Sequence, residues 1–119
     1  MEPFKIIFYQ NEDGTKPVAD FLRSLDIDMR AKIASEIAML KQFGNLLREP
    51  HSKPIEDGIF ELRAKFGSDI SRVLYFFFAG RRVVLTNGFV KKTQKTPKAE
   101  IELAKQYRKD FLRQVAEDV

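Results

Sequence analysis

The sequence predicts an α+β domain with a mostly antiparallel sheet and the element order β-α-α-β-β-β-α. Apolar residues alternate with polar ones from residue 59 onward, as in strands, whereas helical spacing precedes and follows this region. The 119 residues are 44% hydrophobic, and a chain of this length buries roughly two thirds of its unfolded surface. We therefore expect residues 1–119 to form a single domain, with two N-terminal helices packed on the sheet and a C-terminal helix.

The N-terminal third is predicted to form one strand and two helices. β-branched and aromatic side chains predict the strand over residues 4–10. Pro17 and apolar residues at helical spacing predict a helix over 17–25. A second helix is expected from an N-cap at Asp28 to Gly44. Its apolar stripe, expected in the core, consists of Met29, Ile33, Ile37 and Leu40.

The segment from residue 45 to 58 is predicted to be a loop. It contains Pro50, Pro54 and Gly58, and its apolar residues follow neither a helical nor a strand period. The single histidine of the chain, His51, lies in this segment. Its distance from any site therefore depends on where the loop folds.

Three strands and a helix are expected after this loop. Residues 60–65 alternate apolar and charged side chains, which is typical of a strand with one apolar and one charged face. Residues 70–78 are apolar on both faces, and residues 83–86 complete an antiparallel meander. Thr96 and Pro97 suit the cap and first turn of the helix. The apolar face expected for this helix consists of Ile101, Ala104, Tyr107, Phe111 and Val115.

Composition excludes several classes of protein. Without cysteine there is no disulfide scaffold, thiolate metal site or cysteine nucleophile. One histidine cannot build the multi-histidine sites typical of catalytic zinc, so no metal or other cofactor is expected. The sequence has neither an apolar run of about 20 residues nor a secretion signal, so we expect a cytoplasmic protein that does not bind membranes.

Basic residues are concentrated in one third of the chain. The formal net charge is +4, but residues 62–98 carry nine basic side chains and one acidic side chain, Asp69. If these positive charges lie on one surface, they favour the binding of a polyanion, and phosphate backbones are the commonest polyanion in cells. The alternative is that these side chains only protect strand edges from aggregation.

Arg63 and Arg72 are the strongest candidates for an anion site. An antiparallel register that places them opposite each other brings two guanidinium groups together, which is unfavourable unless an anion lies between them. Ion pairs with Asp69 or with an acid on the second helix are structural alternatives. The lysines expected to join the pair at this end of the sheet are Lys91, Lys92 and Lys95.

No nucleophile motif accompanies these residues, since the sequence has no serine elbow and no phosphate-binding glycine loop. Cations around a phosphate suit the attack of an RNA 2′-hydroxyl on its neighbouring phosphate, because the substrate then supplies the nucleophile. The candidates for a general base are Glu61, one of the three lysines, and His51 if its loop folds over the site. Further contacts with RNA are expected from Lys65, Arg81, Arg82 and Lys98.

Several segments form a recognisable pattern. They read PVADFL at 17–22, GIFELR at 58–63, RVLYF at 72–76 and LTNGFVKKTQKTP at 85–97. Glu100, Ile101, Ala104 and Arg108 continue the pattern in the last helix. Together these segments resemble the HigB-like branch of the RelE toxin superfamily over nearly the whole chain, and residues 87–97 are the most specific part.

The resemblance implies a single RelE-like toxin domain over residues 1–119. It implies the toxin of a type II toxin–antitoxin pair: a metal-independent, ribosome-dependent endoribonuclease that cleaves mRNA, leaves a cyclic phosphate, and inhibits translation and growth. The implied partners are the ribosome, mRNA and a cognate antitoxin, expected to be a HigA-like helix-turn-helix protein in a hetero-oligomer.

Site residues follow from the same resemblance. Arg72 matches the arginine that binds the scissile phosphate in RelE-like toxins, and Arg63 matches a basic residue at the end of the preceding strand. The three lysines occupy a region that holds further catalytic residues in relatives. Glu61 stands where some relatives have a basic residue, and the tyrosine or histidine that others place after the last strand is not evident, so the general acid and base are unassigned. A non-catalytic RNA- or ribosome-binding module and a phage-type structural protein are the alternatives.

Overall fold

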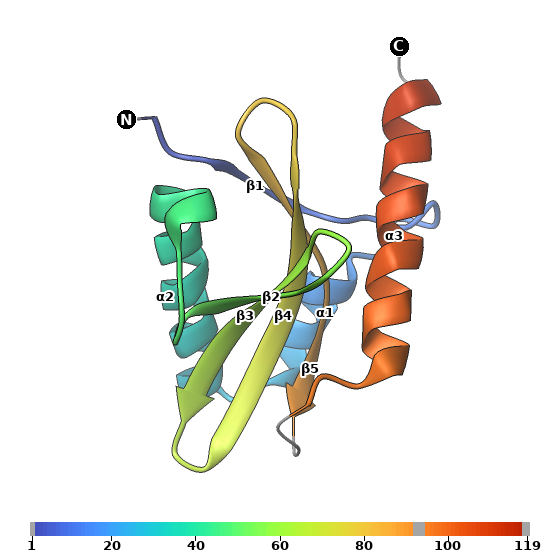
Figure 1. Cartoon of the computed structure of the whole chain (residues 1–119). Helices are drawn as coiled ribbons and strands as arrows, with labels where there is room; N and C mark the ends of the chain where they lie inside the picture. Colours follow the sequence, from blue (N-terminus) through green and yellow to red (C-terminus); the bar gives the residue numbers. More distant parts are fainter. Residues whose placement is uncertain (1, 92–94, 118–119) are drawn as a thin grey trace.

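The computed structural model describes residues 2–91 and 95–117 and shows a five-stranded sheet between helices on both of its faces (Figure 1). The strand order is β1-β5-β4-β3-β2, in which β1 runs parallel to β5 and the other neighbours are antiparallel. The predicted α+β class and mostly antiparallel sheet are therefore confirmed. The elements are β1 (Lys5–Phe8), α1 (Pro17–Ser24), α2 (Ile27–Phe43), the 3₁₀ turn η1 (Gly44–Leu46), β2 (Ser52–Glu56), β3 (Ile59–Phe66), β4 (Asp69–Phe78), β5 (Arg82–Lys91) and α3 (Lys98–Glu117).

A strand that the sequence did not predict, β2, lies within the segment expected to be a loop. Ser52 is opposite Leu62 and Pro54 is opposite Phe60, so β2 pairs with β3 at the edge of the sheet. Pro54 has no N–H, and an edge strand tolerates this because one of its sides needs no ladder bonds. The element order is therefore β-α-α-β-β-β-β-α, and the predicted order was wrong by this strand.

Two boundaries near the N-terminus differ from the predicted ones for local reasons. The N-cap of α2 is Asp26 and not Asp28, because the Asp26 carboxylate accepts a hydrogen bond from the N–H of Met29 at 2.9 Å. β1 begins later than predicted, since the N–H of Phe4 donates to the carbonyl of Lys41 in α2 at 2.7 Å.

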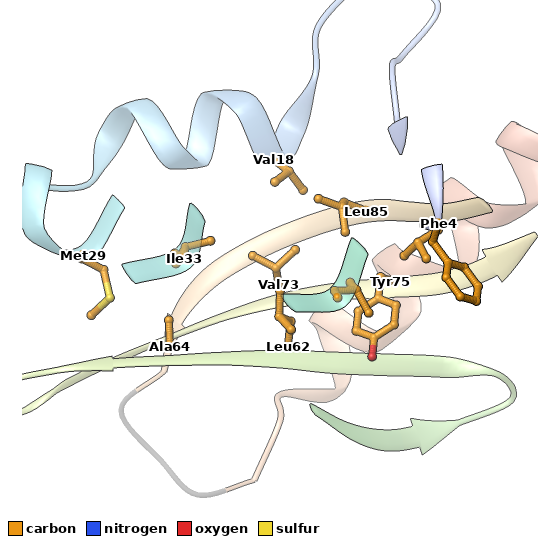
Figure 2. Close-up of a cluster of buried hydrophobic side chains, with 11 residues drawn as sticks. Phe4, Val18, Met29, Ile33, Leu62, Ala64, Val73, Tyr75 and Leu85 are labelled. Atoms are coloured by element: carbon orange, nitrogen blue, oxygen red, sulfur yellow. The ribbon is translucent and has the colours of Figure 1, made fainter. Parts of the chain in front are cut away.

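Each face of the sheet carries its own core. α1 and α2 cover one face, where Val18 and Ile33 pack with Val73 and Leu85 of the central strands (Figure 2). α3 covers the opposite face (Figure 1). The buried residues of this second core are Tyr9, Ile59, Leu74, Phe76, Val84 and Ala104.

The second core changes the environment of β3. The sequence predicted a charged face on this strand, but Ile59 on that face is buried with α3 and Glu61 is only 1% exposed. Alternation reports which residues share a face and does not report whether that face is covered. A carboxylate that is buried in this way requires hydrogen-bond or ion-pair partners.

Gly88 of β5 leaves no room for a side chain, because α1 packs directly on it. An added β-carbon would lie 2.3 Å from Cδ2 of Phe21. We expect Gly88→Ala to lower the free energy of unfolding, measured by urea titration, by about 1–3 kcal/mol, as at other overpacked sites. In a Phe21→Ala background the same change should cost less than about 1 kcal/mol. Equal costs in both backgrounds would contradict the steric explanation.

Candidate functional site

Arg63 and Arg72 lie opposite each other on neighbouring strands. They are Cα partners in the antiparallel pairing of β3 with β4, which confirms the register expected from the sequence. Two guanidinium groups so placed repel each other unless negative charge lies nearby.

The chain itself supplies a negative charge between them. Oε2 of Glu61 accepts hydrogen bonds from Nη1 of Arg72 at 2.6 Å and from Nε of Arg63 at 3.3 Å. Oε1 of the same carboxylate accepts one from the hydroxyl of Thr96, just before α3, at 2.6 Å. One buried carboxylate therefore holds two guanidinium groups and the start of the last helix.

Arg72 is an internal cation and not a free surface charge. It is 5% exposed, and its partner is Glu61 on the adjacent strand, whereas the structural alternative considered from the sequence was an acid on the second helix. Its Nε is buried and has no hydrogen-bond partner among the described residues. Because one carboxylate cannot balance two guanidinium groups, the cluster formed by Glu61, Arg63 and Arg72 retains positive charge.

The cluster borders a groove of about 590 Å³ beside the β3–β4 hairpin and α2. This volume is within the range of small-molecule sites. Of the residues that the structure describes, one acid, Glu36, lines it, against four Lys and Arg residues. The lining residues are Lys32, Glu36, Pro50, His51, Arg63, Ala64, Lys65, Gly67, Ile70 and Arg72.

His51 enters this groove from the segment before β2. Its carbonyl oxygen accepts a hydrogen bond from the N–H of Arg63 at 2.9 Å, and its Nδ1 lies 2.9 Å from Oε2 of Glu36 on α2. The loop that the sequence left unplaced therefore folds against the arginine pair.

Other predicted cations lie at the same end of the sheet. Lys65 lines the groove, and Lys91, the last residue of β5, is the Cα partner of Ile70 in the groove wall. Lys95 and Lys98 are exposed and follow β5 toward the start of α3. The predicted catalytic Lys92 lies outside the described residues.

Arg81 and Arg82 do not join this group, although the sequence placed them on the same RNA-binding surface. Arg82 begins β5 and Lys91 ends it, which separates them by roughly 30 Å at about 3.3 Å per residue. Their guanidinium groups lie over the rings of Phe4 and Phe78, at 4.2 Å and 4.4 Å from the ring centres. They stabilise the far end of the sheet by cation–π contacts.

Two groove residues on α2 were missed from the sequence. Lys32 and Glu36 are four residues apart, so they share one side of the helix. That spacing could have been noticed, but nothing in the local sequence indicates that this side of α2 meets the end of β3.

Metal and membrane features were also searched for in the described residues. No group of three or more His, Cys, Asp and Glu residues there is arranged to hold a metal ion. None of the helices in residues 2–91 and 95–117 combines the length and apolar character needed to span a bilayer.

A larger cavity, of about 1050 Å³, lies between the β1–α1 loop and α3 and has acidic residues in its wall. There the Tyr9 hydroxyl donates a hydrogen bond to Asp110. Burial and this bond raise the pKa of Tyr9, while the same bond and Arg113 lower the pKa of Asp110. Among the described residues, its wall carries three carboxylates (Glu12, Asp13 and Asp110) against Lys109 and Arg113, so this cavity favours a phosphate less than the groove beside the arginines does.

Glu61→Ala tests whether the buried carboxylate holds the cluster together. It leaves Arg72 buried without its counter-charge, so we expect the free energy of unfolding to fall by about 3–5 kcal/mol in urea titrations. Glu56→Ala is the matched control, since Glu56 is half-exposed in its ion pair with Lys105 and should cost less than about 1 kcal/mol. Similar losses for the two variants would contradict the bridging role.

Asp110 should make stability depend on pH in acid. Because its pKa is lowered on folding, its contribution is complete above the unfolded pKa of about 4 and is lost as the pH falls through the folded value. The difference in unfolding free energy between the wild type and Asp110→Asn should therefore be largest at pH 7 and shrink toward about pH 2. A difference that is constant over this range would refute the assignment.

The comparisons with known proteins identify a family for this chain. The family model described as "Phage derived protein Gp49-like (DUF891)" matches residues 20–109, which include the two arginines, Glu61, His51 and the basic segment after β5. A search of curated proteins found no match. On the extent of the family match, the chain belongs to the Gp49-like family, a toxin-like, phage-derived family within the RelE/HigB-type toxin–antitoxin superfamily.

Proposed function

We propose that this chain is a HigB-like toxin of a type II toxin–antitoxin pair, and that it cleaves mRNA on the ribosome. The observation that carries the proposal is the pairing of Arg63 with Arg72 on the wall of a basic groove, with one carboxylate between them. Membership of a toxin–antitoxin superfamily supports it.

The proposed reaction uses the RNA's own nucleophile. The 2′-oxygen forms a bond to phosphorus, the bond from phosphorus to the 5′-oxygen breaks, and the products are a 2′,3′-cyclic phosphate and a 5′-hydroxyl. Negative charge grows on the phosphoryl oxygens in the transition state. The guanidinium groups of Arg63 and Arg72 match these oxygens, because their N–H donors are fixed in a fork.

Glu61 serves this reaction as a positioning residue. It is 1% exposed, and both of its oxygens already accept hydrogen bonds from the chain, which makes it a poor acceptor for a substrate proton. By occupying Nη1 of Arg72 and Nε of Arg63, it fixes the direction of the remaining N–H donors.

The surrounding lysines bind the rest of the RNA in this proposal. Lys32 and Lys65 line the groove and would contact the phosphates next to the scissile one. From their place in the sequence, further phosphate contacts are proposed for Lys91, Lys92, Lys95 and Lys98. Such contacts steer a polyanion to the groove and fix its register.

A cognate antitoxin is the expected partner. A basic groove is costly to leave open among cellular RNA, so an acidic or helical segment that covers it would block access to the ribosome. We propose that this segment belongs to a HigA-like helix-turn-helix protein, bound in a hetero-oligomer.

One observation favours a second function, a module that binds RNA or the ribosome without cleaving it. The Arg72 guanidinium is held in an internal ion pair, as in a purely structural cluster. Such a module would bind RNA with an affinity that falls steeply with salt. It would leave no cleaved mRNA ends in primer extension.

Replacement of the arginines tests the nuclease. Expression of the wild type should arrest growth and produce new 5′ ends in cellular mRNA. Arg63→Ala and Arg72→Ala should each lower the cleavage rate about 100-fold or more, because each removes a donor to the charged transition state. Thermal unfolding should first show that both variants fold.

Arg82→Ala is the matched control, because Arg82 lies at the far end of the sheet, and it should keep the arrest. Full toxicity of a folded Arg72→Ala variant would refute the assigned role. Growth arrest by the wild type without cleaved ends would favour the binding module.

A further inference from the structure

The groove contains a histidine that a buried carboxylate orients. Nδ1 of His51 lies 2.9 Å from Oε2 and 3.3 Å from Oε1 of Glu36. The Glu36 side chain is 9% exposed, whereas the His51 side chain is 36% exposed and lines the groove. A buried carboxylate with its imidazole partner open to a cavity is an arrangement suited to proton transfer.

The contact with Glu36 selects which ring nitrogen can act. A carboxylate accepts hydrogen bonds, so the neutral imidazole places its proton on Nδ1 and leaves the lone pair on Nε2, at the opposite edge of the ring. The ionised Glu36 also stabilises the imidazolium that forms when Nε2 takes up a proton.

The backbone fixes the ring near the arginines. The carbonyl of His51 accepts the N–H of Arg63 at 2.9 Å, and the N–H of His51 donates to the carbonyl of Arg48 at 3.0 Å. The His51 backbone therefore lies one strand spacing from β3, and the residue lines the same groove as Arg63 and Arg72. A phosphate held by the arginines would have its 2′-hydroxyl within the same groove.

We propose that His51 is the general base of the cleavage reaction and that Glu36 is its positioning residue. The inference rests on the proposed nuclease function. Nε2 of His51 accepts the proton of the 2′-hydroxyl as the 2′-oxygen bonds to phosphorus. The leaving 5′-oxygen takes up a proton from water, and the imidazolium then releases its proton to solvent, so that the enzyme returns to its starting state.

The charged residues that line the groove with His51 come from three elements among the described residues. Glu36 and Lys32 lie on α2, Arg63 and Lys65 lie on β3, and Arg72 lies on β4. A general base must enter the reaction as the neutral ring. Cleavage should therefore fall in acid, as the ring takes up a proton before the substrate arrives.

The test uses the full chain with ribosomes that carry a defined mRNA. We expect His51→Ala to lower kcat about 100-fold or more with little change in KM, and to abolish the acid limb of the rate profile. Added imidazole should restore part of the rate. Glu36→Gln should lower kcat at least about 10-fold with little change in KM, because an amide no longer orients the ring or stabilises the imidazolium formed in the reaction.

Lys53→Ala is the matched control, because Lys53 is exposed on β2 outside the groove, and it should keep the wild-type rate. A structural bridge between His51 and Glu36 would lower the melting temperature of both variants but leave the pH profile unchanged.

A folded His51→Ala variant that cleaves at the wild-type rate with the wild-type pH profile would overturn the proposal for His51. If Arg72→Ala is inactive in the same assay, the nuclease function survives that result. No cleavage by the wild type would overturn both.

Discussion

The candidate site depends on one buried carboxylate. Glu61 lies on the face of the sheet that α3 covers, and it accepts hydrogen bonds from two arginines and from Thr96. Without it, Arg72 would be a buried charge without compensation, which proteins rarely tolerate. The same contact joins β3, β4 and the entry to α3, so the geometry of the arginines and the docking of the last helix are not independent.

Helices cover both faces of the sheet, which explains why charged side chains lie beside apolar cores at the end of the sheet that carries Arg63 and Arg72. α3 packs on the central strands, while β2 begins at Ser52, opposite Leu62, so β3 from Arg63 onward has no partner strand on that side among the described residues. The groove forms in that unoccupied corner, with α2 as its other wall. The groove therefore forms where β2 does not extend along β3, and the longer strands β3 and β4 supply its arginines.

Local features of the structure could be predicted from the sequence, and long-range ones could not. The register of Arg63 with Arg72 follows from a short hairpin, whose turn at Gly67 fixes the pairing. β2 was missed because an edge strand with a proline has no clear period. The burial of Glu61 and the meeting of His51 with Glu36 depend on how helices dock, which no spacing within one segment reports. Arg81 and Arg82 were grouped with the site by sequence proximity, although β5 carries them to its other end.

The parallel pairing of β1 with β5 affects how the chain is assembled on the ribosome. Strands β2 to β5 are consecutive neighbours and form by local zippering, but Lys5 has no partner until Arg82 has been made. At translation speeds of about 5–20 residues per second, the first strand waits at least several seconds for its neighbour. Thr96 arrives later still, so the nascent polypeptide acquires the complete arginine cluster only after residue 96 has been made.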